Sequence, residues 1–152
     1  MIYLKSREAL HTFKIEVMKG KEISLTVKPM TTPLKLAAQA RAKKRIEQEH
    51  GEIDDANMRA SLQVAYMVFE LGAALIVKWS GVGDEQGNEV PPTPERIEAL
   101  LDIYPIGEEF FKTICRLQAE RLFSKKDSGV SASGISSETE APNTARHASN
   151  SI

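Results

Sequence analysis

The residues best suited to metal chemistry are three histidines and one cysteine, and they are scattered along the chain. The histidines are His11, His50 and His147, and the cysteine is Cys115. A zinc site draws on three or four such ligands, often in pairs a few residues apart. None of these residues forms such a pair. We therefore predict no metal site and no cofactor, and we interpret the histidines as surface residues.

The acidic segment 84–89 (DEQGNE) has the composition of a calcium-binding loop but not its spacing. An EF-hand loop of about 12 residues needs oxygen ligands at its first, third, fifth and last positions, with glycine at the sixth. Counted from Asp84, Gly87 falls at the fourth position instead of the sixth, and the twelfth position lies beyond the predicted helix start at Pro94. The segment therefore predicts a turn.

Nucleophilic catalysis and phosphate binding find no support either. The single cysteine lies inside an amphipathic segment, where a small buried apolar residue is the usual role, so we predict that Cys115 is buried. Gly81 and Gly83 are followed by two carboxylates, which would repel a phosphate. No motif combines an acid, a base and a nucleophile. We therefore predict that the chain is not an enzyme.

Basic residues cluster over positions 41–45, and the acidic residues Glu47, Glu49 and Glu52 follow directly. No aromatic residue is interleaved for base stacking. We interpret the basic run as a solvated helix face, with a partner-binding patch as the alternative. The formal net charge of the chain is -1, which gives no global electrostatic reason to expect nucleic acid or an anionic membrane as a partner.

Two consecutive aromatic residues, Phe110 and Phe111, cannot both face one core from a helix. Either one of them is exposed and marks an interface, or both are buried on two sides. Trp79 and Tyr104 are further candidates, although a tryptophan near a helix end normally anchors the loop that follows. The predicted partner-contacting residues are Arg41, Lys44, Arg45, Trp79, Tyr104, Phe110 and Phe111.

Strict alternation of apolar and polar residues predicts a β-hairpin near the N-terminus. Residues 12–18 place Phe13, Ile15 and Val17 on one face, and residues 23–27 alternate in the same way after a turn that contains glycine. Two strands alone are marginal in water, so we expect the hairpin to pack its apolar face on helices.

Helical patterns fill most of the remainder. A Thr32-Pro33 start predicts a helix to about residue 48, and an aspartate at 54 or 55 caps a second helix to about Trp79. The second helix is apolar on most sides, which predicts the central helix of the domain, and its small residues 72–74 would allow another helix to approach closely. Thr93 and Pro94 start a short third helix over 94–102, and a last helix ends near Phe123.

These elements predict an α+β fold that is mostly α, with an N-terminal hairpin packed on about four helices. We expect one compact domain over residues 1–123 and a disordered tail rich in Ser, Ala, Gly and Thr over 124–152. The longest apolar stretch, 64–77, is shorter than the ~20 residues of a membrane span and carries Glu70. The N-terminus is charged within a few residues and does not resemble a secretory signal, so a cytoplasmic location is expected.

A pattern of turns and helix starts resembles a family of phage proteins. The matching segments are 79–88 (WSGVGDEQGN), 90–95 (VPPTPE), 99–102 (ALLD), 104–106 (YPI) with Phe110, and 28–34 (KPMTTPL) with the alanines at 37 and 38. In these segments the chain resembles tail assembly chaperones, small proteins encoded among the tail genes of tailed bacteriophages and prophages.

The resemblance implies a non-enzymatic binding protein. Such chaperones bind the long tape-measure protein before the tail tube polymerises around it, keep its apolar helices soluble, and leave the finished tail. The expected partners are therefore the tape-measure protein and possibly the tail tube protein, with a homo-oligomer also open, and neither nucleic acid nor membrane.

Two other functions stay open on the sequence alone. The chain could be a structural virion component, such as a tail terminator or minor tail protein, and would then persist in the particle. It could also be a small nucleic-acid-binding regulator that uses helices 33–48 and 55–79, although its near-neutral charge and apolar second helix argue against this.

Overall fold

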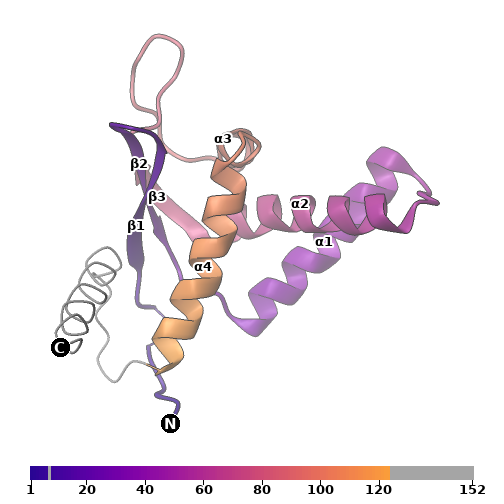
Figure 1. The fold of residues 1–152 in the computed structure, drawn as a ribbon, viewed down its shortest axis with the longest axis horizontal. Coiled ribbons are helices and arrows are strands. Elements are labelled where there is room, and N and C mark those ends of the chain that lie inside the picture. The colour runs from indigo at the N-terminus through magenta and orange to yellow at the C-terminus, as the bar shows by residue number, and fades with distance from the viewer. Residues whose placement is uncertain (7, 124–152) are drawn as a thin grey trace, which may run out of the picture.

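A computed structural model of the chain describes residues 1–6 and 8–123 (Figure 1). In chain order the elements are β1 (His11–Met18), β2 (Lys21–Val27), α1 (Thr32–His50), α2 (Ala56–Leu75), β3 (Ile76–Ser80), α3 (Pro94–Leu101) and α4 (Ile106–Phe123). The segment 124–152, for which the sequence predicts a disordered tail, lies outside the described residues.

The predicted hairpin is confirmed. Strands β1 and β2 pair antiparallel, with Phe13 opposite Leu25 and Ile15 opposite Ile23, and all four side chains are buried. Gly20 adopts a φ of 79° in the turn, a conformation that side chains with a Cβ rarely adopt. The alternation of apolar residues therefore builds one buried face, as the sequence indicates.

A third strand corrects the predicted extent of the second helix. The sequence predicts helix as far as Trp79, but α2 ends at Leu75 and the chain continues directly into β3, which pairs antiparallel with β2. Residues 76–79 (IVKW) are mostly β-branched or aromatic, types that favour strands over helices. The outer edge of β2 offers them hydrogen bonds, and placing Trp79 opposite Leu25 buries both side chains.

The helix starts follow the sequence with one shift. The hydroxyl of Thr31 accepts a hydrogen bond from the Leu34 amide at 3.4 Å, so Thr31 caps α1 and the predicted cap at Thr32 is wrong by one residue. Asp55 caps α2 and Thr93 caps α3, in agreement with the prediction. A one-residue shift leaves the rotation of the helix, and hence its buried face, unchanged.

Helix α4 lies alongside the sheet and contacts β1, whereas α1 and α2 form a helical hairpin that extends away from the sheet (Figure 1). The four largest fully buried side chains come from the sheet, α2 and α4: Leu25, Leu71, Leu75 and Phe110. The rings of Phe13 and Phe110 lie 6.5 Å apart, which joins the hairpin to α4. The core therefore sits between the sheet and the inner ends of the helices.

Gly72 brings α2 and α3 into close contact, as the small residues at 72–74 predict. A methyl group at this position would overlap Leu101 and would lie 3.0 Å from Ile97. One expectation is corrected by the structure: Cys115 is exposed on α4, not buried. Its neighbours Ile114 and Leu117 take the buried face of that helix, and Cys115 is rotated away from it.

The architecture is thus α+β and mostly helical, with a three-stranded antiparallel sheet and four helices, and this confirms the predicted fold class. Among the described residues, no helix combines the length and the apolar character that a membrane crossing requires.

Candidate functional site

An open apolar groove of about 600 Å³ lies between α2 and the corner where α3 meets α4. Its walls come from the outer face of α2, the turn after α3, and the first turns of α4. The lining residues are Ser61, Val64, Ala65, Val68, Phe69, Leu101, Asp102, Ile103, Tyr104, Gly107, Glu108, Phe111 and Lys112. We call this feature the α2–α4 groove.

The apolar walls of the groove are unusually exposed. Val64 is 49% exposed, Ile103 51% and Tyr104 79%, whereas Phe111 is partly buried and packs against the core. Large apolar side chains that gather on one surface commonly mark an interaction site. The groove therefore offers apolar area to a partner.

A tight turn between α3 and α4 positions the exposed residues. The Ile103 amide donates to the carbonyl of Leu100, and the Ile106 amide donates to the carbonyl of Ile103, so the chain reverses within a few residues. Gly107 allows this reversal because a methyl group there would overlap the Leu101 carbonyl. The turn directs Ile103 and Tyr104 outward at the edge of the groove.

Charged residues form the rim of the groove at the same corner. Asp102 and Glu108 are both exposed, and neither makes an ion pair or a side-chain hydrogen bond within residues 1–6 and 8–123. Lys112 pairs with Glu109 at 2.9 Å, and this hydrogen bond, helped by the negative charge of Glu108, raises the pKa of Lys112. The uncompensated charge on this rim is therefore negative.

The basic run on α1 has a different role. Arg45 donates to Glu98 on α3 at 3.0 and 3.1 Å and to Glu70 on α2 at 3.0 Å, and its guanidinium lies 4.9 Å from the centre of the Tyr66 ring. Arg41 donates to the other oxygen of Glu70 at 2.7 Å. This set, which we call the Arg45 cluster, ties three helices together.

The hydrogen bonds in and beside the Arg45 cluster shift the pKa values of the bonded groups in the directions that favour those bonds. The hydrogen bond from Arg45 to Glu98 raises the pKa of the guanidinium, which keeps it charged. Tyr66 donates its hydroxyl proton to Glu49 at 2.8 Å, and this bond lowers the pKa of Glu49 and raises that of Tyr66. The two arginines of the basic run therefore connect three helices, whereas Lys43 and Lys44 are exposed, as predicted for a solvated face.

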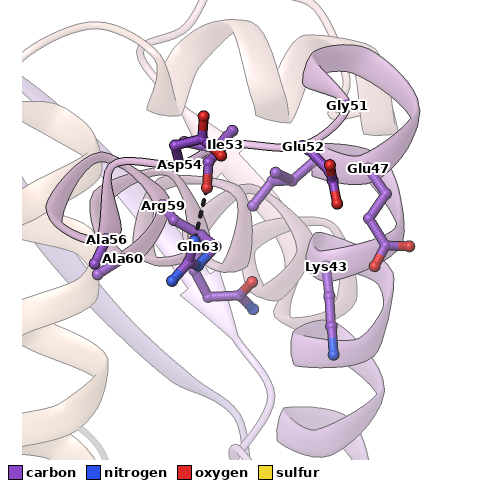
Figure 2. A pocket seen from close by; sticks show the side chains of 11 residues that line it. Lys43, Glu47, Gly51, Glu52, Ile53, Asp54, Ala56, Arg59, Ala60 and Gln63 are labelled. Atoms are coloured by element: carbon purple, nitrogen blue, oxygen red, sulfur yellow. Dashed lines mark hydrogen bonds between the residues drawn. The ribbon is translucent and has the colours of Figure 1, made fainter.

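A second open pocket, of about 730 Å³, lies at the tip of the α1–α2 hairpin (Figure 2). It is lined by charges of both signs, among them Lys43, Glu47 and Asp54. Arg59 donates to the carbonyl of Ile53 at 2.7 Å, which fixes the connecting loop. In Figure 2 the side chains of Lys43 and Glu47 lie away from this bond, and the charged groups do not converge on one point.

In the described residues, the side chains that could bind a metal are dispersed. Within the part of the chain that the structure describes, no group of three or more His, Cys, Asp or Glu side chains is placed to hold a metal ion. In the acidic loop, one oxygen of Asp84 accepts hydrogen bonds from the amides of Gln86 and Asn88 at 3.0 and 2.9 Å. The carboxylate closes a turn, as predicted for this segment.

Comparison with known proteins identifies the family. Residues 31–132 match the family described as YdaY prophage protein, and this range covers more than half of the 152 residues. The chain belongs to the YdaY prophage protein family. No curated protein and no solved structure shows significant similarity to it. The YdaY match includes all four helices and β3 but begins after the β1–β2 hairpin.

The predicted site residues of this YdaY-family chain fall into three places. Tyr104 and Phe111 both line the α2–α4 groove. Trp79 and Phe110 belong to the core, and the Trp79 indole donates to the carbonyl of Val90 at 2.6 Å, anchoring the loop that follows β3. On α1, Arg41 and Arg45 belong to the Arg45 cluster and Lys44 is exposed. The structure therefore brings together only part of the predicted set.

The sequence did not predict the exposed apolar residues Val64 and Ile103 of the groove, nor its rim carboxylates Asp102 and Glu108. Val64 lies in a segment that is apolar on most sides, so its pattern does not show which side faces outward. Ile103 follows a helix end, where an isolated apolar residue carries no periodic signal. Its position between a helix stop and the Tyr104-Pro105 pair was the one available hint of a projecting turn.

Proposed function

We propose that this prophage protein is a tail assembly chaperone that binds helical segments of the tape-measure protein and keeps them soluble until the tail forms. One observation carries the proposal: a member of a prophage family presents an exposed apolar groove between helices. A groove of this kind suits an amphipathic helix, which binds by laying its apolar side chains into it.

The energetics favour a holding function. Burying one large aliphatic side chain contributes about 1.5–3 kcal/mol, so three or four anchors contribute about 5–12 kcal/mol, which is of the same order as the cost of association. A chaperone that must leave the finished tail needs a complex that dissociates. The modest size of the groove, about 600 Å³, is consistent with such moderate affinity.

The proposal requires no bond-making chemistry. In this function the protein is a binding protein and not an enzyme, and it acts in the cytoplasm of the bacterial host, where phage tails are assembled. Its affinity for partner helices comes from Val64, Ile103, Tyr104 and Phe111, which supply the exposed apolar area.

Co-expression with the tape-measure protein of the same prophage tests the proposal. We expect the tagged chain to capture that protein and to keep it in the soluble fraction, and we expect mass spectrometry of purified particles to lack the chain. Absence of capture, with the chain present at fixed stoichiometry in particles, would refute the chaperone function and support a structural tail component instead.

A further inference from the structure

We propose that the α2–α4 groove selects helices whose apolar stripe is flanked by lysine or arginine. This inference rests on the proposed function, since it concerns the same groove and states what kind of partner segment enters it. It goes beyond that function because apolar burial alone would accept any amphipathic helix, whatever its charge.

The rim charges carry the argument. Asp102 and Glu108 stand beside the most exposed apolar residues of the groove, and both lack ion-pair partners among the described residues. The basic residue of the lining, Lys112, is held by Glu109 at 2.9 Å. A partner therefore meets exposed carboxylates together with a lysine whose charge is already paired.

The positions of these carboxylates relate them to a docked helix. Asp102 ends α3 and Glu108 lies in the first turn of α4, so both flank the turn that carries Ile103 and Tyr104. A helix that inserts apolar side chains beside this turn places its flanking positions over the rim. Lysine or arginine there would be attracted, whereas glutamate or aspartate would be repelled.

The attraction is local. The chain as a whole has a formal net charge of -1, which is too small to draw basic peptides to it indiscriminately. Rim charges of this kind change the association rate and the salt dependence, and each is worth a factor of a few in affinity.

A pair of designed peptides tests the inference on the full chain. Both are amphipathic helices of about 18 residues with the same leucine stripe, and the flanking positions are all lysine in one and all glutamate in the other. We expect the lysine peptide to bind at least about tenfold more tightly, and we expect its affinity to fall as salt is raised from about 50 to 300 mM.

Charge-neutralising variants locate the effect. The double variant Asp102→Asn with Glu108→Gln should lower the affinity for the lysine peptide about 3- to 10-fold. The matched control, Glu95→Gln with Glu85→Gln, removes the same charge. It includes another first-turn glutamate and touches neither wall of the groove. This control should leave the affinity within about twofold of the unmodified chain.

Three outcomes would overturn the inference: equal binding of the two peptides, an unchanged affinity in the rim variant, or no binding of either peptide. None of them decides the proposed function, which depends on capture of the tape-measure protein in co-expression. Capture together with charge-blind peptide binding would leave the chaperone function intact and refute the charge selection alone.

Discussion

At the scale of single residues, Phe110 and Phe111 show how one helix serves both the core and the groove. Successive residues of a helix point about 100° apart. In α4 this rotation buries the Phe110 side chain completely against Phe13 of the sheet, while Phe111 lies at the edge of the core and lines the α2–α4 groove. Two adjacent aromatic residues can therefore be separated by mutation into a stability role and a binding role.

We expect Phe111→Ala to weaken partner binding at least about tenfold with a loss of folding stability of about 1 kcal/mol, because only part of its ring is buried. Phe110→Ala is the matched comparison and should cost about 3–5 kcal/mol, the range of emptied core sites. Urea unfolding and a peptide-binding titration measure the two effects. A loss near 3 kcal/mol in the Phe111 variant would assign that side chain to the core instead.

The Arg45 cluster gives a second prediction at this scale. Arg45→Gln should destabilise the fold by about 1–3 kcal/mol, because it removes charge-assisted bonds to both Glu70 and Glu98 and leaves those carboxylates facing each other. Arg116→Gln breaks an exposed pair with Glu120 within one helix and should change stability by less than about 0.5 kcal/mol. Equal losses in the two variants, measured by urea unfolding, would show that the cluster contributes nothing beyond an ordinary surface pair.

At the scale of elements, the sequence was informative about strands and helix starts but not about the end of α2. Alternation revealed the hairpin, and aspartate and threonine caps revealed α2 and α3, because both signals are local. The switch from α2 to β3 at Leu75–Ile76 depends on hydrogen bonds from β2, about fifty residues earlier in the chain. The groove could not be predicted from the sequence either, because Val64 and Tyr104 come together only after α3 has packed on α2.

The α2–α3 contact at Gly72 provides a test at this scale. Gly72→Ala gains up to about 1 kcal/mol of helix propensity, but its methyl group would overlap the end of the buried Leu101 side chain, which must then shift within the core. Overpacking of this kind costs about 1–3 kcal/mol, so we expect net destabilisation. Ala73→Ser also adds one heavy atom, at the exposed neighbouring position, and should be nearly neutral. A Gly72→Ala variant with a raised thermal midpoint would contradict this packing.

The loop between β3 and α3 has a predictable response to pH. The hydrogen bond from the Asn88 backbone amide, followed by the one from the Gln86 amide, lowers the pKa of Asp84 below its ordinary value of 3.8. Because the folded pKa is the lower one, the stabilisation is fully present above pH 3.8 and is lost as the pH falls through the folded pKa.

Asp84→Asn keeps an accepting oxygen but no charge, which isolates this effect. We expect the stability difference between wild type and variant to be largest above about pH 4 and to shrink as the pH is lowered. Urea midpoints measured across the acid range provide the readout. Glu85→Gln is the control, because the Glu85 carboxylate accepts no hydrogen bond among the described residues. If the stability difference between wild type and Asp84→Asn stayed constant with pH, the charge of Asp84 would not be what stabilises the turn.

At the scale of the whole molecule, the sheet and the helices share one core. Leu25 of β2 is completely buried and lies opposite Trp79 of β3, and Phe13 of β1 packs on Phe110 of α4. The family match, however, starts at residue 31, after both strands of the hairpin. The helical part that the family defines is therefore covered, in this chain, by a hairpin from outside the matched range.

This dependence leads to the last prediction. A chain that begins at Pro29 lacks β1 and β2, so β3 loses its strand partner, and the apolar faces of Trp79 and Phe110 become exposed to water. Each large side chain that loses its burial costs about 1.5–3 kcal/mol, and a domain has only about 5–15 kcal/mol to lose. We expect this chain to be insoluble, or to unfold without a cooperative thermal transition.

The matched truncation begins at Leu10 and removes only residues 1–9, which precede β1. The described residues of that segment make contacts such as the hydrogen bond from the Tyr3 amide to the Leu122 carbonyl at 3.0 Å, but none of them belongs to the core. It should therefore fold cooperatively, with a lower midpoint. If the chain that begins at Pro29 also unfolded cooperatively, the helices would form an autonomous unit. In that case the helices would not need the hairpin in order to fold, and the apolar face of the hairpin could bind another partner.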